Sequence, residues 1–206
     1  MALQLPMQKD GEEVKKLKLS MSKTATFKVE LMWESDQDLD AHALLATNDG
    51  AGAKVDSMDQ VLSTFNSKKT NSAGALVTNA DGSFSTPCGT LSHSGDSRTG
   101  VTKAVDEFII INGAKAAATV NEIPIFITIY KADKTGVTFK QVTKAGVRIS
   151  DDDGKVLCEY ELSNEFGAFN AVQMGSIVLN ENGGWEFAAV GNGFNGDFNT
   201  VLGFFS

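Results

Sequence analysis

The chain has 206 residues, of which 42% are hydrophobic and 21% are charged, and its formal net charge at pH 7 is −8. This length and composition allow one well-packed core, so we expect a single domain over residues 1–206. The acidic balance argues against a protein that binds the phosphate backbone of nucleic acids, because such proteins need a basic face.

The sequence also predicts a cytoplasmic protein without a membrane span. No apolar stretch approaches the ~20 residues that cross a bilayer, and the N-terminal residues lack the basic and apolar regions of a signal peptide. Cys88 and Cys158 are the only cysteines. Because the cytosol keeps thiols reduced, we expect both to be free.

In the first half of the chain, alternation of apolar and polar residues predicts short strands. Segment 14–21 alternates loosely, and 27–33 then alternates strictly, with its aromatic and aliphatic residues on one face. An acidic cluster occupies 36–40, and the apolar segment 41–46 predicts the next strand. Residues 51–90 are the least regular part and predict long surface loops around one or two short strands.

The second half carries the densest runs of β-branched and aromatic residues. Segments 108–112 and 123–130 have the composition of central strands. Further strands are expected at 147–149, 155–162, 171–179 and 185–190. Segment 138–145 has apolar residues three apart and predicts a short helix. Many short strands with at most two short helices predict an all-β fold, a two-sheet β-sandwich with long acidic loops.

The acidic cluster contains Asp36, Asp38 and Asp40, which project to one side of an extended backbone. Three such charges repel one another unless water or a cation screens them. An EF-hand loop would need Gly and Glu where this chain has Ala41 and Thr47, so that motif is excluded. Spacing alone leaves two readings open, a cation site and a solvated acidic turn.

A second polar segment, 91–107, has no apolar run long enough for a core strand. It is rich in glycine and in side chains that carry oxygen, and it closes with Asp106 and Glu107. Such a segment cannot be held by the hydrophobic effect. We therefore expect a hard cation, shared with 36–40, to hold it.

Both segments carry motifs that extend along most of the chain. The pattern D-x-D-L-D-A-x-A is matched by Asp36, Asp38, Leu39, Asp40, Ala41 and Ala43, and Leu45 follows close behind. The pattern H-x-G-D-N-x-T-G is matched by His93, Gly95, Asp96, Thr99 and Gly100, with Ser97 in place of Asn. Segment 139–142 matches F-x-Q-V, and within 184–194 the residues from Trp185 on match W-x-F-x-A-V-G-x-G-Y/F, in the same order along the chain. Together these motifs resemble the TerD family of tellurite-resistance and stress proteins.

The resemblance implies a β-sandwich that binds Ca²⁺ through its acidic loops. The ligands that it implies, carried over by position, are Asp36, Asp38, Asp40, Asn66, Asp96, Thr99, Asp106 and Glu107. Between T-G and D-E the family has a Gly/Asp-rich run, whereas this chain has 101–105, with the sequence VTKAV. This difference removes at least one carboxylate, so we expect one calcium ion and a weak or absent second one.

We therefore predict a non-enzymatic, calcium-binding protein of the stress-response type whose partners are other proteins. One alternative is a structural or assembly component, for example of a phage particle, because the aromatic residues of 194–206 would suit docking or self-association. Another is a hydrolase that uses His93 with the carboxylates. Catalytic carboxylates need different environments, and this cluster offers similar ones. We expect His93 to pack or hydrogen-bond and so to fix its loop.

Overall fold

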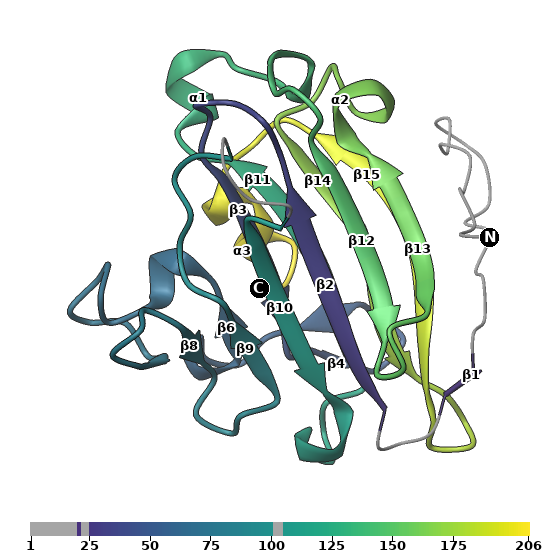
Figure 1. The fold of residues 1–206 in the computed structure, drawn as a ribbon. Helices are drawn as coiled ribbons and strands as arrows, with labels where there is room; N and C mark the ends of the chain where they lie inside the picture. Colours follow the sequence, from purple (N-terminus) through teal and green to yellow (C-terminus); the bar gives the residue numbers. More distant parts are fainter. Residues whose placement is uncertain (1–19, 22–24, 101–104) are drawn as a thin grey trace.

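The computed structural model describes residues 20–21, 25–100 and 105–206, which form two antiparallel sheets that face each other (Figure 1). The first sheet has six strands in the order β1 (Ser20–Met21), β15 (Trp185–Phe194), β14 (Ala171–Leu179), β11 (Glu122–Ile129), β3 (Leu39–Leu44) and β6 (Val61–Leu62). The second has seven in the order β13 (Val156–Glu161), β12 (Gly146–Asp151), β2 (Thr26–Met32), β10 (Glu107–Asn112), β9 (Leu91–His93), β8 (Phe84–Ser85) and β7 (Val77–Thr78). Strands β4 (Thr47–Asn48) and β5 (Ala53–Lys54) form a separate pair. The mainly β, sandwich-like architecture predicted from the sequence is confirmed.

The second sheet buries one face because apolar and polar residues alternate along its strands. In β2, Val29 is buried, whereas Lys28 and Glu30 lie on the outer face and form an ion pair with Nζ 2.6 Å from Oε1. Val29 lies opposite Ile109 of β10 and Ile149 of β12, so three neighbouring strands present aliphatic side chains at one level. The core lies between this face and the first sheet.

The centre of the first sheet is buried on both faces. In β11, Ile125 belongs to the main core, whereas Phe126 points to the outer face. There Phe126 packs against Val201 and Phe205, because helix α3 (Phe198–Gly203) lies against this face near β3 (Figure 1). An apolar run without alternation, as in β11, is the expected pattern for a strand covered on both sides.

The C-terminal aromatic residues mostly pack inward, in contrast to the exposed surface that the sequence suggests. Phe198 and Phe205 are each 7% exposed, and only Phe204, at 54%, remains largely in solvent. The ring of Phe204 lies edge-on to Phe194, 5.2 Å away. The helix α3 therefore serves first as a cover for the sheet.

Several predicted elements differ from the structure in their bounds, and the strand expected at 185–190 continues to Phe194. The strand expected at 41–46 begins at Leu39, so Asp40 is a strand residue. The helix expected at 138–145 is a single 3-10 turn, Phe139–Gln141. Phe139 and Val142 are both buried. A 3-10 turn has three residues per turn, so it places two residues three apart on the same side, as the expected helix would.

The short helices α1 (Ala132–Thr135) and α2 (Leu162–Glu165) have one turn each and show no periodicity by which they could be predicted. Residues 14–19 of the first expected strand lie outside the described residues, and β1 pairs with the start of β15. Among the described residues, no helix is long and apolar enough to cross a membrane.

We expect Gly175→Ala to destabilise the fold, because Gly175 lies at the bulge of β14 under a neighbouring strand. A Cβ there would approach Ala188 O to 2.4 Å and Phe187 Cε2 to 2.8 Å. Overpacking of this kind lowers the free energy of unfolding by about 1–3 kcal/mol. Gly203→Ala is the control, since a Cβ at Gly203 meets nothing within 4 Å. Urea denaturation measures both, and an equal loss in the two variants would contradict the packing argument.

Candidate metal centre

The loops that carry the acidic residues meet at one end of the sandwich. Segment 33–38 connects the end of β2 in the second sheet to the start of β3 in the first. The last residue of β9, His93, lies opposite Ile109, near the start of the antiparallel strand β10. Asp40 is the second residue of β3 and Asp38 directly precedes that strand, so both side chains project to one side. Asp96 comes from the loop after β9.

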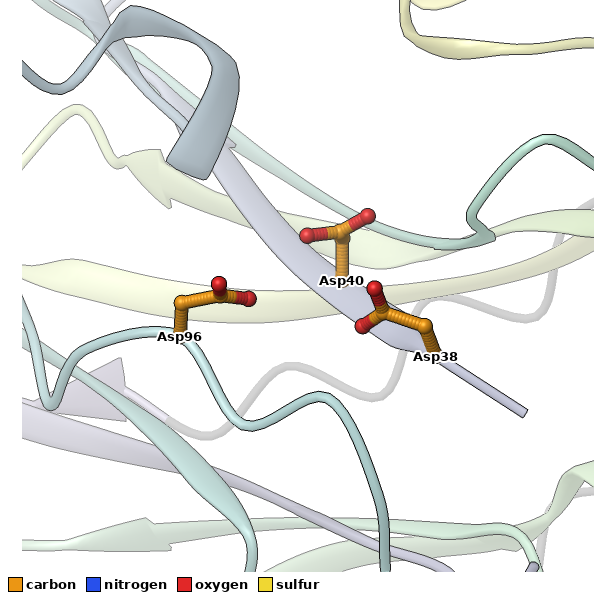
Figure 2. A group of neighbouring side chains, drawn as sticks. All are labelled: Asp38, Asp40 and Asp96. Carbon is orange, nitrogen blue, oxygen red and sulfur yellow. The ribbon is translucent and has the colours of Figure 1, made fainter. Parts of the chain in front are cut away.

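The carboxylates of Asp38, Asp40 and Asp96, the acidic triad below, turn toward one another (Figure 2). One oxygen from each lies within 4.8 Å of the others. Asp40 is only 3% exposed, Asp38 is half-buried and Asp96 is exposed. The triad thus forms a funnel with a buried floor and an open mouth, and it draws on both sheets.

Two oxygens of the triad are buried without a hydrogen-bond partner among the described residues, namely Asp38 Oδ1 and Asp40 Oδ2. The second oxygen of Asp40 accepts a hydrogen bond of 2.6 Å from the Thr64 hydroxyl. A buried carboxylate oxygen without a donor costs free energy, so these two atoms call for a proton or a cation.

The electrostatics agree with this requirement. Burial, followed by the charges of Asp96 and Glu107, raises the pKa of Asp38 to about 6, although the charge of Arg98 acts in the opposite direction. Burial and then the charge of Glu107 raise the pKa of Asp40 well above its usual range, although the Thr64 hydroxyl opposes the shift. The triad therefore gathers more negative charge than its protein surroundings stabilise.

Glu107 lies beneath the triad and is fully buried. Its Oε1 accepts from the N–H of Ser97 at 3.0 Å, and its Oε2 accepts from the N–H of Ala41 at 3.2 Å. One carboxylate therefore fastens the loop that carries Asp96 to the strand that carries Asp40. Both carboxylate oxygens of Glu107 accept hydrogen bonds from backbone N–H groups. The role of Glu107 is therefore to hold the loop and the strand of the centre together.

His93 holds this support in place, in the role expected from the sequence. Its Nδ1 accepts from the N–H of Gly95 at 3.1 Å, and its Nε2 lies 3.3 Å from Glu107 Oε2, within ion-pair distance but without hydrogen-bond alignment. The ring stacks on Phe84 with centroids 4.5 Å apart. Because Nδ1 accepts a hydrogen bond, the imidazole proton is assigned to Nε2, on the side of Glu107.

Trp33 joins the two loops on the other side of the centre. Its N–H donates to Asp106 Oδ2 at 3.0 Å, and its Nε1 donates to the carbonyl of Gln37 at 2.7 Å. The N–H of Gly100 donates to the carbonyl of Ser35 at 3.1 Å. A Cβ at Gly100 would come within 2.1 Å of the Trp33 carbonyl, so this close approach requires glycine.

The remaining residues implied by the resemblance take other positions. Asp36 is exposed and lies outside the triad, and Thr99 is exposed, with its carbonyl accepting from the Ser97 hydroxyl. Asn66 is buried, and its amide donates to the carbonyls of Met58 and Val61. Its own oxygen accepts from a backbone N–H, so Asn66 fastens the loop that carries Thr64.

Two contacts of the centre were missed from the sequence. Thr64 reaches Asp40 from a segment without periodicity, and only the neighbouring Asn66 pointed to that region. Arg98 donates to Asp96 Oδ2 at 3.3 Å and is 82% exposed. Residues 101–104, which carry most of the departure from the family motif, lie outside the described residues.

We expect Glu107→Gln to lower the free energy of unfolding by about 1–3 kcal/mol, because the new amide leaves one buried N–H, of Ser97 or Ala41, without an acceptor. Glu34→Gln is the matched control, since the Glu34 side chain is 55% exposed and forms an exposed ion pair with Lys144. Urea denaturation compares the two. Equal stability of both variants would show that Glu107 does not hold the loop to the strand.

A family model described as the TerD domain matches residues 3–205. The tellurium resistance protein TerD of Alcaligenes sp is 31% identical over 195 residues, which cover 89% of this chain and 90% of that protein. General stress protein 16U of Bacillus subtilis (strain 168) is 34% identical over 109 residues, 52% of this chain and 56% of its own, so the match spans about half of that relative.

The solved structures agree in fold. The crystal structure of a homologue of telluride resistance protein from Streptomyces coelicolor A3(2) matches with a TM-score of 0.69 and 19% identity. The match covers 87% of this chain and 95% of that one. With a family model over nearly its whole length and a relative that is 31% identical across most of both chains, the chain belongs to the TerD domain family.

Proposed function

We propose that this protein is a non-enzymatic, calcium-binding member of the TerD domain family, with one Ca²⁺ held by the acidic triad. One observation carries the proposal. Two buried carboxylate oxygens, Asp38 Oδ1 and Asp40 Oδ2, have no hydrogen-bond partner among the described residues, and they belong to the cluster that Asp96 completes. A cation satisfies both oxygens and offsets the mutual repulsion of the triad.

The donor set favours calcium over other metals. Three carboxylates supply only oxygen, which suits hard cations, whereas zinc sites in proteins usually include cysteine or histidine. Calcium accepts roughly six to eight oxygens in irregular arrangements, so water and further protein oxygens can complete its shell. Magnesium demands a near-octahedral shell and keeps more of its water. Of the histidines, His42 bonds Ser63 and Thr128, and His93 serves the support described above.

Calcium bound here would join the two sheets. Asp38 and Asp40 belong to the start of β3 in the first sheet, and Asp96 follows β9 in the second. The ion would therefore act as a clamp at one end of the sandwich. Within the described residues the triad is one cluster, and we propose one ion for it.

The use of this clamp is inferred from the relatives. Their names connect them with tellurium resistance and with general stress, and we propose a role in a stress response for this chain. Catalysis by His93 is disfavoured, because that ring is 1% exposed and lies against Phe84. The two thiols, Cys88 and Cys158, are free, which supports a reducing, cytoplasmic location.

We expect calcium to raise the melting temperature, because a ligand that binds only the folded state stabilises it by about 2.7 kcal/mol at a hundred times its Kd. The rise in melting temperature that calcium causes should become smaller as the pH is lowered through about 6. Asp38 has a pKa raised from 3.8 to about 6, so in chelator its contribution to stability is complete below its unfolded pKa and is lost as the pH rises through about 6. Calcium replaces that proton at neutral pH.

Thermal unfolding in calcium and in EGTA, followed from about pH 5 to pH 7.5, measures this dependence. Superimposable melting curves in the two solutions at neutral pH would overturn the calcium proposal. A calcium effect that does not change with pH would instead exclude Asp38 as a ligand.

We expect Asp40→Asn combined with Asp96→Asn to abolish calcium binding in calorimetry, because it removes two of the three charges at the centre. The strand signal in circular dichroism should persist, since the main core lies between the sheets. Asp152→Asn with Asp153→Asn is the matched control, because these exposed carboxylates lie in the β12–β13 turn. Unchanged calcium affinity in the first variant would show that the triad is not the ligand set.

A further inference from the structure

The two carboxylate oxygens of Asp40 have different surroundings, although both belong to a side chain that is only 3% exposed. Oδ1 accepts a hydrogen bond of 2.6 Å from the hydroxyl of Thr64, whereas Oδ2 has no hydrogen-bond partner among the described residues. A length of 2.6 Å is typical of a strong hydrogen bond from a hydroxyl to a charged carboxylate. Thr64 therefore takes one oxygen of Asp40 and leaves the other to the centre.

The hydroxyl of Thr64 is a fixed donor, because the turn that carries it is anchored independently of Asp40. Thr64 begins the 3-10 turn Thr64–Asn66, and the residue before it, Ser63, has its hydroxyl 3.0 Å from Nδ1 of His42. His42 lies two residues after Asp40 in β3, on the same face of the strand. Ser63 and Thr64 therefore contact two successive side chains on one face of β3.

Asn66 anchors the end of the turn. Its side-chain amide donates to the carbonyls of Met58 at 2.7 Å and Val61 at 2.9 Å, and its Oδ1 accepts from the N–H of Ala75 at 3.2 Å. Gly74 lies directly against the turn, since a Cβ at Gly74 would come within 2.3 Å of the Asn66 carbonyl oxygen. Asn66 thus acts on the centre through the turn, and its amide oxygen is directed to a backbone N–H.

Aromatic packing anchors the middle of the turn. Phe65 stacks on Phe198 of α3, with centroids 5.4 Å apart and an interplanar angle of 13°. Its ring also lies 5.8 Å from that of Tyr130, the residue after β11. The neighbours of Thr64 therefore have contacts of their own, so the position of the Thr64 hydroxyl does not depend on Asp40.

We propose that Thr64 is a positioning residue of the metal centre, which orients Asp40 so that only Oδ2 is directed to the cation beside Asp38 and Asp96. The inference rests on the proposed function, because it concerns how calcium is bound there. Calcium then contacts Asp40 through one oxygen, and the other oxygen stays on the hydroxyl. Partners of this kind fix the orientation of a metal ligand, and their loss typically weakens metal binding by about 10–100-fold.

Thr64→Val tests the role of the hydroxyl, because valine keeps the branched shape and removes the donor. We expect calcium to bind this variant at least about tenfold more weakly in calorimetry. Without the donor, Oδ1 of Asp40 is buried without a partner, and the carboxylate is no longer held in one orientation. Unchanged or tighter calcium binding would contradict the proposal.

Two further substitutions separate the hydroxyl from the rest of the side chain. Thr64→Ser keeps the hydroxyl, and its Kd for calcium should stay within about threefold of that of the unmodified chain. Thr64→Ala lacks the hydroxyl and should weaken calcium binding as Thr64→Val does, which also covers the case in which the valine variant does not fold. Weak binding by the serine variant would show that the shape of the side chain decides, and would refute a role of the hydroxyl.

Thr86→Val is the matched control, because Thr86 is also a buried threonine, 1% exposed. Its hydroxyl donates to the carbonyl of Leu91 at 3.3 Å and accepts from the N–H of Leu91 at 3.2 Å, so it serves the backbone between β8 and β9. We expect this variant to keep its calcium affinity. Equally weakened binding in the two valine variants would indicate a general effect of lost stability and would overturn the assignment to Thr64.

A measurement without metal separates positioning from a role in folding. In EGTA, the strand signal of Thr64→Val in circular dichroism should be unchanged, because the turn keeps the contacts of Ser63, Phe65 and Asn66. Loss of that signal in both variants that lack the hydroxyl would show that the bond holds the fold, and the positioning role would be wrong.

Calorimetry of the unmodified chain separates this inference from the proposed function. Calcium binding by the unmodified chain, with the same affinity in Thr64→Val, would exclude the positioning role and leave the proposed function intact. Absence of calcium binding by the unmodified chain would overturn the proposed function, and the positioning role with it.

Discussion

The mutual repulsion of three carboxylates at the end of the sandwich is the constraint on which the rest of the site depends. Asp38, Asp40 and Asp96 have oxygens within 4.8 Å of one another, and Asp40 is almost fully buried. In such surroundings each carboxylate destabilises the charged form of the others, and water cannot fully compensate. An arrangement of this kind is stable only where other contacts hold the chain in place, or where a proton or a cation neutralises part of the charge.

Hydrogen bonds around the triad hold the chain in this arrangement. Glu107 fastens β3 to the loop after β9, His93 backs Glu107, and Trp33 fastens the other side through Asp106 and the Gln37 carbonyl. These contacts use backbone N–H groups and buried side chains. The carboxylates of the triad instead accept hydrogen bonds from side chains, Asp40 from Thr64 and Asp96 from Arg98. The residues that hold the loops together are therefore different from the residues whose oxygens are available to a cation.

The alternation of apolar and polar residues predicts most of the strands, because it depends only on neighbouring positions in the sequence. The site is less predictable, because its residues come from separate segments. Strand β14 was predicted with its bounds, and the pairing of Asp38 with Asp40 follows from an extended backbone. The position of Asp96 beside Asp38 and Asp40 is implied by the family motif, because the contact between loops of two different sheets has no local signal in the sequence. The contact of Thr64 with Asp40 depends on how an aperiodic segment folds, and the roles of Glu107 and Asn66 depend on their backbone partners.

The one cationic side chain that contacts the triad among the described residues lies at its exposed mouth. Arg98 is the one basic group paired with the triad in the described part of the chain, and its side chain is 82% exposed. A solvent-exposed ion pair contributes little, because water and salt screen it and the long side chain loses entropy. The unsatisfied oxygens lie on the buried floor, beneath Asp96, where a guanidinium held at the mouth does not reach them. In the proposed function, a small, doubly charged ion enters the funnel and contacts all three carboxylates at once.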